Sequence, residues 1–121
     1  MPLNDFFSYS ITASDSGHVK AQISFDASHR IYDGHFPGNP VTPGVVLLEI
    51  MRQILGAHVG KDLMLSSAKD IKFTNPVIPT QNNEMILEIN FEDAEDEITV
   101  NAVFSGEEVV FTKIRGRYCE V

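Results

Sequence analysis

One stretch of the chain changes abruptly from loop-forming residues to an apolar helix, and this change limits the available folds. Residues 34–53 read GHFPGNPVTPGVVLLEIMRQ, with glycines and prolines crowded into the first half. Proline lacks a backbone donor and glycine disfavours regular structure, so this half is predicted to be a loop. The loop belongs to a longer irregular segment, residues 26–43, whose aromatic residues Tyr32 and Phe36 argue against disorder. Such a segment in a compact domain indicates a functional loop.

The second half of the stretch predicts a helix from Gly44 to about Ala57. Apolar residues cover nearly every side of it, which is typical of a buried helix. Glu49, Arg52 and Gln53 form a single polar stripe, because residues three and four apart share a helix face. A sheet that surrounds a single helix leaves little of the helix surface open to solvent. Glu49 is therefore predicted to be buried and held near its protonated form. An ion pair would oppose that state, and we therefore expect Arg52 to point elsewhere.

Alternating apolar and polar residues predict strands on both sides of the helix. Two half-buried strands, within residues 7–14 and 18–25, are predicted to form a hairpin. About four more follow Ser66 and Ser67, near residues 70–74, 84–92, 98–104 and 110–118. Two strands, a loop, one long helix and four strands predict an α+β fold, with an antiparallel sheet around a single helix. Residues 1–121 are predicted to form one domain.

Composition excludes several classes of function. The net charge of −8 argues against a nucleic-acid partner, since phosphate binding needs a basic surface. The longest apolar run, residues 45–48, is too short to span a membrane. No cysteine and histidine spacing or calcium loop indicates a metal, and no cofactor is expected. We expect a cytoplasmic protein that forms oligomers and binds neither nucleic acid nor membrane.

Residues 35–49, HFPGNPVTPGVVLLE, closely resemble the active-site signature of the 3-hydroxyacyl-(acyl carrier protein) dehydratases of fatty acid synthesis. The PVIP sequence at residues 76–79 also matches, so the resemblance spans nearly the whole chain. It implies a hotdog fold, in which a curled antiparallel sheet encloses one long helix. It further implies a substrate carried by acyl carrier protein or coenzyme A, and a homodimer or a higher oligomer of dimers.

By resemblance, His35 is the catalytic base and Glu49 the acid, while the N–H of Gly44 polarises the substrate thioester. Such a dehydration needs a base at the alpha carbon, an acid for the hydroxyl and donors for the enolate-like oxygen. The resemblance also implies a site shared by two protomers, with a cis peptide between His35 and Phe36. The predicted substrate-binding residues are Phe36, Gly44, Val45 and Gln53.

Several residues depart from the family pattern and leave the acyl-chain specificity open. Thr42 replaces a large apolar residue, Arg52 stands where a small residue is common, and Thr80-Gln81 replaces Gly-Asp. Fatty acid synthesis and a polyene-pigment pathway are both compatible with the resemblance. Two other functions stay open, namely a hotdog acyl thioesterase and a catalytically silent acyl-binding subunit.

A basic stripe is the predicted docking surface for an acidic carrier protein. Its residues are Lys72, Lys113, Arg115 and Arg117. The last three alternate along one strand and so share a face. An ordinary solvated sheet face is an equally weighted interpretation. The docking hypothesis rests on charge. A chain with a net charge of −8 would repel an acidic partner unless it had a local basic surface.

Overall fold

The structure packs one helix against a six-stranded antiparallel sheet. This computed structural model describes residues 7–26, 42, 44–78, 83–94 and 96–121. In chain order, the described elements are β1 (Phe7–Asp15), β2 (His18–Phe25), α1 (Gly44–Val59), β3 (Leu63–Phe73), β4 (Glu84–Asp93), β5 (Ile98–Gly106) and β6 (Val109–Glu120). The predicted α+β class is confirmed.

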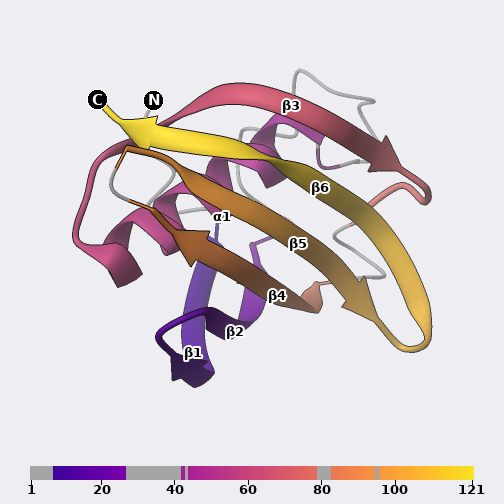
Figure 1. Cartoon of the computed structure of the whole chain (residues 1–121). Coiled ribbons are helices and arrows are strands. Elements are labelled where there is room, and N and C mark those ends of the chain that lie inside the picture. The colour runs from indigo at the N-terminus through magenta and orange to yellow at the C-terminus, as the bar shows by residue number, and fades with distance from the viewer. Residues whose placement is uncertain (1–6, 27–41, 43, 79–82, 95) are drawn as a thin grey trace.

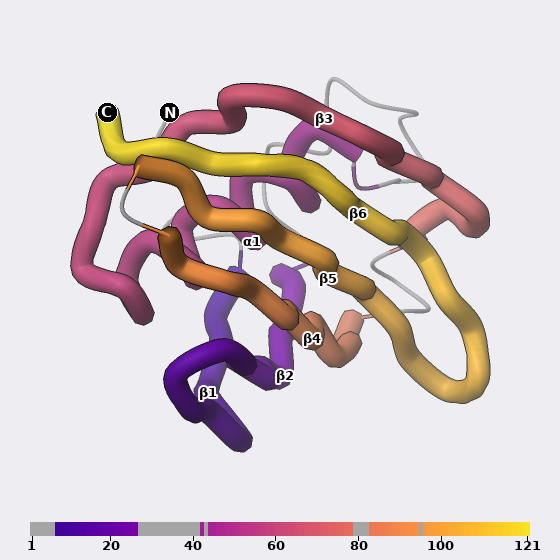
Figure 2. The backbone as a smooth tube through the Cα atoms, in the orientation of Figure 1, coloured from indigo at the N-terminus to yellow at the C-terminus, as the bar shows by residue number. Residues whose placement is uncertain are grey.

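The sheet curls strongly across its width. Its strand order is β1-β2-β4-β5-β6-β3, so β1 and β3 form the two edges. In Figure 1, β3, β6, β5 and β4 lie side by side, while β2 and β1 turn steeply away from them. Figure 2 shows the same curl, with α1 behind the strands. The curled sheet provides the concave surface that receives the helix.

Only one side of α1 is buried. The residues on that side are Val46, Leu47, Ile50, Met51, Ile54 and Leu55. On the other side the side chain of Val45 is 72% exposed, and Glu49 and Arg52 are half-buried. The prediction of a helix enclosed all round is therefore wrong, because the sheet covers one face and leaves the opposite face open.

The strands agree with the alternating pattern except near the two sheet edges. β1 and β2 pair as the predicted hairpin, but β1 is exposed from Ser8 to Asp15 and is not half-buried. As an edge strand, it gains pairing from β2 alone. β3 begins at Leu63, earlier than predicted, and continues through Ser66 and Ser67. Its register with β6 shifts near these serines, and such a bulge hides the alternation from a sequence pattern.

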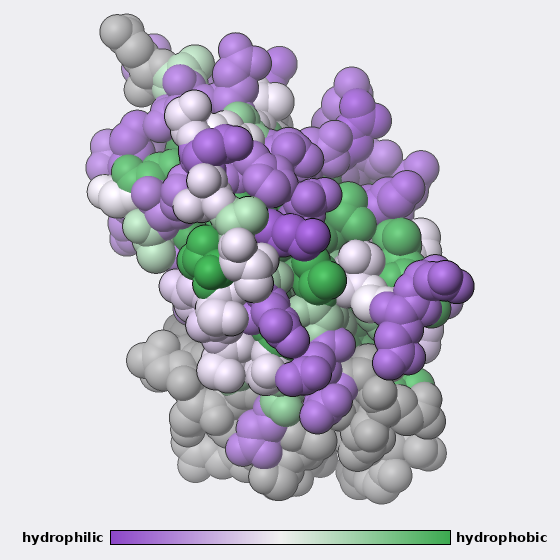
Figure 3. Space-filling model, turned by 90° about the horizontal axis from the view of Figure 1, so that it is seen from below, coloured by the Kyte–Doolittle hydropathy of each residue, from purple (hydrophilic) through white to green (hydrophobic). Residues whose placement is uncertain are grey.

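The outer surface mixes polar and apolar groups. Figure 3 views the molecule from below relative to Figure 1, and its hydrophobic atoms form separate patches between hydrophilic ones. Within the described ranges, no helix is long and apolar enough to cross a membrane. Gly60, with φ of 73°, lies directly after α1 in the left-handed conformation common at helix ends.

Candidate active site

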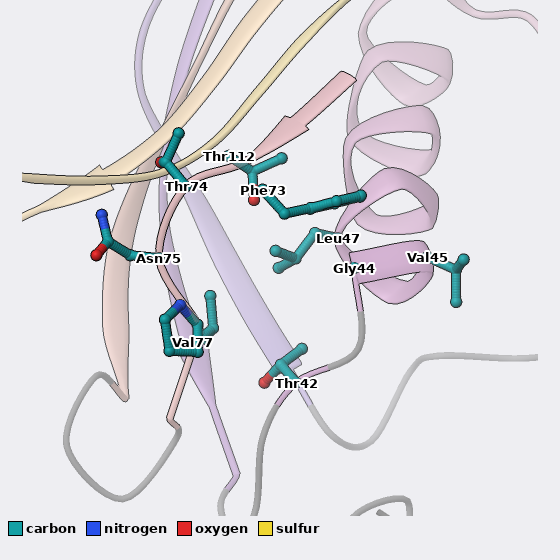
Figure 4. Close-up of a pocket in the computed structure, with 10 residues that line it drawn as sticks. Thr42, Gly44, Val45, Leu47, Phe73, Thr74, Asn75, Val77 and Thr112 are labelled. Atoms are coloured by element: carbon teal, nitrogen blue, oxygen red, sulfur yellow. The ribbon is translucent and has the colours of Figure 1, made fainter.

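A pocket of about 500 Å³ opens at the N-terminal end of α1. Its lining comprises Gly44, Val45 and Leu47 of α1, residues 73–77, and the threonines Thr42 and Thr112. Figure 4 shows these residues around a space between the helix and the strands. Its volume lies within the range of about 300 to 1,000 Å³ that is typical of small-molecule sites. We refer to it as the helix-start pocket.

Hydrogen bonds hold the wall that follows β3. The hydroxyl of Thr74 donates to the carbonyl oxygen of Val110 at 2.7 Å, and the side-chain amide of Asn75 donates to the same oxygen at 2.8 Å. The backbone N–H of Thr42 donates to the carbonyl oxygen of Val77 at 2.8 Å. These bonds tie the wall to β6 on one side and to Thr42, two residues before α1, on the other, so the pocket is preformed.

Gly44 begins α1, and the ring of Phe73 lies directly against it. A Cβ atom at Gly44 would come 2.5 Å from Cε1 of Phe73, closer than real side chains approach. The Phe73 side chain is 54% exposed, so it has space to move aside. Backbone N–H groups in a first helical turn have no partner within the helix and lie at the positive end of its dipole. The absence of a side chain at Gly44 therefore lets another group approach these donors closely.

Thr112 contributes a buried hydroxyl to the same pocket. The residue is 0% exposed, and its Oγ1 has no hydrogen-bond partner among the described residues. In the sheet it lies opposite Phe73 of β3 and Phe104 of β5. An unpaired buried hydroxyl costs roughly 1–3 kcal/mol. Thr112 is not among the residues predicted from the sequence, although it alternates in phase with Ile114 and is thereby the polar exception on an inward face.

Glu49 lies further along α1, where Arg52 and Gln53 bind its carboxylate. The guanidinium of Arg52 contacts both oxygens, donating from Nη2 to Oε1 and from Nε to Oε2, the latter at 2.9 Å. The amide of Gln53 donates to Oε1 at 3.2 Å. The Glu49 side chain is 34% exposed. Two donors from the same helix therefore hold the carboxylate in place on the open side of α1.

Arg52 also connects α1 to the start of β3. Its Nη1 donates to the backbone oxygen of Leu63 at 2.9 Å and to Oδ1 of Asp62 at 3.2 Å. The guanidinium thus has acceptors beyond Glu49. This second set of contacts fixes the direction in which Arg52 points.

The contact with Arg52 lowers the pKa of Glu49. Hydrogen bonding from Arg52 is the largest cause, desolvation by burial opposes it, and the bond from Gln53 lowers the pKa further. Two predictions are therefore wrong, because Glu49 is not held near its protonated form and Arg52 does not point elsewhere. The open face of α1 leaves Glu49 partly solvated, and a spacing of three residues places Arg52 beside it.

The predicted site residues on α1 separate into two places. Gly44 and Val45 line the helix-start pocket, although the side chain of Val45 points away from the other labelled residues in Figure 4. Glu49 and Gln53 bind each other and do not line that pocket. Gln53 instead lines a hollow of about 400 Å³ near the end of the helix.

The predicted base lies outside the described part of the chain. His35 and Phe36 both belong to residues 27–41, as does the peptide bond between them. Glu49 and Gly44, the predicted acid and thioester-binding residue, are described. The described geometry therefore contains two of the three predicted catalytic elements.

The predicted docking cations lie on neighbouring strands. They are Lys72 of β3 and Lys113, Arg115 and Arg117 of β6, and all four are exposed. Lys72 lies directly opposite Lys113 in the ladder. Lys72 approaches Asp70 at 3.6 Å, and Arg117 approaches Glu97 at 3.8 Å. Lys113, Arg115 and Arg117 alternate with buried residues and therefore lie on the outer face of the sheet, opposite to the face that carries Thr112.

Comparison with known proteins supports the resemblance drawn from HFPGNPVTPGVVLLE. A family model described as ApeI-like, ApeI dehydratase, matches residues 11–113. A 3-hydroxyacyl-[acyl-carrier-protein] dehydratase FabZ of Novosphingobium aromaticivorans is 30% identical, with 93% of this chain and 70% of that protein covered. A FabZ of Fusobacterium nucleatum is 36% identical over 50% of this chain and 47% of the relative. The chain thus spans about half the length of the Fusobacterium protein, and it covers 56% of a FabZ of Erwinia tasmaniensis.

A solved structure gives the same fold. The dehydratase heterocomplex ApeI:P from Xenorhabdus doucetiae matches with a TM-score of 0.73 at 20% identity, covering 92% of this chain and 95% of that one. At this identity the match identifies the fold, and the curled sheet with its one described helix is the predicted hotdog arrangement. The predicted relationship to the FabZ-type dehydratases is also confirmed. The chain therefore belongs to the ApeI-like dehydratase family, with a hotdog fold.

Proposed function

We propose that this chain removes water from (3R)-3-hydroxyacyl thioesters to give trans-2-enoyl thioesters, in fatty acid or polyene-type biosynthesis. The observation that carries the proposal is the layout of α1. The helix begins at Gly44 beside a preformed pocket and carries Glu49 on the face that the sheet leaves open. Membership of a dehydratase family supports the same chemistry. The reaction needs proton transfers and no cofactor.

In the proposed reaction, His35 takes the proton from the alpha carbon of the substrate. The bond between the beta carbon and its hydroxyl then breaks, a carbon–carbon double bond forms, and the hydroxyl leaves as water with a proton from Glu49. The N–H of Gly44 stabilises the negative charge that develops on the thioester oxygen. A first-turn N–H is suited to this role because it has no partner within the helix.

The ion pair with Arg52 places a condition on Glu49. An acid must carry a proton, yet the lowered pKa keeps the paired Glu49 ionised at neutral pH. Arg52 has other acceptors in Asp62 and the carbonyl of Leu63, so it can release Glu49 and remain hydrogen-bonded. We infer that bound substrate displaces Arg52 and thereby raises the Glu49 pKa.

The same ion pair favours a second candidate function, thioester hydrolysis. An ionised Glu49 is suited to activating water against a thioester bound at Gly44. Such an enzyme would release a free acid, whereas a dehydratase releases an enoyl thioester. A silent acyl-binding subunit would release neither product. Mass spectrometry of the products formed from a 3-hydroxyacyl thioester separates the three functions.

The proposal includes a dimer, either alone or within a larger assembly of dimers. The open face of α1 carries the 72% exposed Val45, and the edge strand β3 carries the exposed Met64 and Leu65. A second copy would cover these apolar groups and bring its own His35 to Glu49. The Xenorhabdus structure is a dehydratase heterocomplex, so a different subunit is the alternative partner.

The substrate carrier is proposed to be an acyl carrier protein in the cytoplasm, with coenzyme A thioesters as the alternative. The basic stripe supports docking, because Lys113 and Arg115 have no ion pair among the described residues. Lys113 directly follows Thr112 in β6, but the two side chains point to opposite faces of the sheet, so the stripe lies on the face turned away from α1.

Removing either proposed proton-transfer residue should abolish most activity. General acids and bases are worth about 10² to 10⁴ in rate, so His35→Ala and Glu49→Gln should each lower kcat by that factor. Circular dichroism should show an unchanged fold. Near wild-type turnover in a folded variant would exclude that residue from the mechanism.

Replacing Arg52 should change the pH dependence of the reaction. Arg52→Gln removes the main cause of the lowered Glu49 pKa, so this pKa should rise in carboxyl NMR titrations. If Glu49 donates as an acid, the alkaline limb of the pH–rate profile should then move to higher pH. Asp62→Asn, which removes another acceptor of Arg52, is the matched control and should leave the limb in place. An acidic limb that moves instead would identify the carboxylate as the working form, as hydrolysis requires.

A shared site predicts complementation between inactive variants. When His35→Ala and Glu49→Gln proteins exchange subunits, half of the sites in a hybrid dimer keep both residues, so activity should return. Native mass spectrometry would verify the exchange. A lack of recovery in verified hybrids would place both residues of a site on one chain. A monomeric and inactive wild type would instead point to a different partner subunit.

Charge reversal on the basic stripe should act on carrier-bound substrate. With Lys113, Arg115 and Arg117 all changed to glutamate, KM should rise for an acyl carrier protein substrate and change little for a short thioester analogue. The wild-type advantage should shrink as salt rises, because exposed charges are screened. If the ratio of the KM values for the two substrates is the same in the variant and in wild type, the stripe is only a solvated face.

A further inference from the structure

The helix-start pocket contains an unpaired polar group that the proposed reaction does not use. Thr112 is 0% exposed, and its Oγ1 has no partner among the described residues. Its hydroxyl lies at the pocket wall near Phe73 and Leu47 in Figure 4. The Thr74 hydroxyl and the Asn75 amide differ from the Thr112 hydroxyl, because both already donate to the carbonyl oxygen of Val110. Thr112 therefore keeps an unused hydrogen-bonding group beside the pocket.

The rest of the lining specifies the kind of group that can bind there. Leu47, Val77 and Phe73 are apolar, and no described residue that lines the pocket carries a charge. A charged end of a ligand would lose its hydration here without a counter-charge. A plain alkyl chain would leave the Thr112 hydroxyl unpaired, as it is in the free protein. A neutral oxygen carried on an otherwise apolar chain satisfies both conditions.

We propose that Thr112 makes the pocket selective for acyl chains that carry a hydroxyl or keto oxygen beyond the reacting carbons. This inference rests on the proposed function in one respect, namely that an acyl thioester binds with its carbonyl at Gly44. The chain then runs from the start of α1 along Leu47 and Val77, and its oxygen meets Thr112. Thr112 is a specificity-determining residue in this arrangement and takes no part in the proton transfers.

Binding of unreactive thioesters tests the proposal without any catalytic step. The probes are saturated acyl-pantetheine thioesters of one chain length, either plain or with a single hydroxyl placed at successive carbons from the fourth to the eighth. Isothermal titration calorimetry gives their Kd values. We expect one hydroxyl position to bind wild type about 3- to 10-fold more tightly than the plain chain, the worth of one hydrogen bond.

Two variants identify the group responsible. Thr112→Val keeps the shape and removes the hydroxyl, so it should abolish the preference, whereas Thr112→Ser keeps the hydroxyl and should retain it. Removing a buried unpaired group should also raise the Tm of free Thr112→Val by several degrees. A preference that persists in Thr112→Val overturns the proposal. The proposal is also overturned if wild type binds every acyl chain with the same Kd or binds none of them. A lower Tm in Thr112→Val than in wild type would overturn it as well.

Failure of the dehydratase proposal would be recognised separately. Turnover of a 3-hydroxyacyl thioester is measured on the same wild-type protein, and its absence rejects dehydration. A preference that depends on Thr112 would then still support the pocket assignment. Conversely, normal dehydration without any such preference would reject the pocket assignment alone.

Discussion

Burial of one side of α1 against the concave sheet determines where the candidate site residues on the helix lie. Ile50, Met51 and Ile54 are at most 1% exposed, and full burial of such a side chain is worth about 1.5–3 kcal/mol. These contacts set the rotation of the helix about its axis. They place Glu49 on the open face and Gly44 beside the helix-start pocket. The chemistry available at the helix thus follows from apolar packing on its opposite side.

Rotation of the helix also explains why one charge pair would decide between the two proposed reactions. Arg52 and Glu49 share the open face, where solvent and a bidentate contact favour the ionised carboxylate. An enclosed helix would have favoured a neutral acid. The pair therefore connects the fold to the protonation state on which the two proposed reactions depend.

Much of the fold could be predicted because one face of most strands is buried, which makes alternation visible in β2, β4, β5 and β6. β1 kept the alternation but lies exposed at an edge, so the pattern overstated its burial. The three-residue spacing along the helix predicts that Arg52 lies beside Glu49, but it does not predict that the guanidinium turns toward the carboxylate. That direction depends on Asp62 and Leu63, which approach through the fold. The same alternation rule predicts that Thr112 is a polar residue on an inward face. Its place beside a pocket is visible only in the structure.

The segment that connects β3 to β4 forms one wall of the helix-start pocket, and the length of this segment can vary. These strands are consecutive in the chain but stand three positions apart in the sheet, so the linking segment must span roughly 14 Å of sheet width. The first residues of that segment, 74–77, line the helix-start pocket. Loops tolerate insertions and deletions far better than ladders do. Relatives could therefore evolve larger or smaller pockets by adding or removing residues here, while every strand pairing stays as it is.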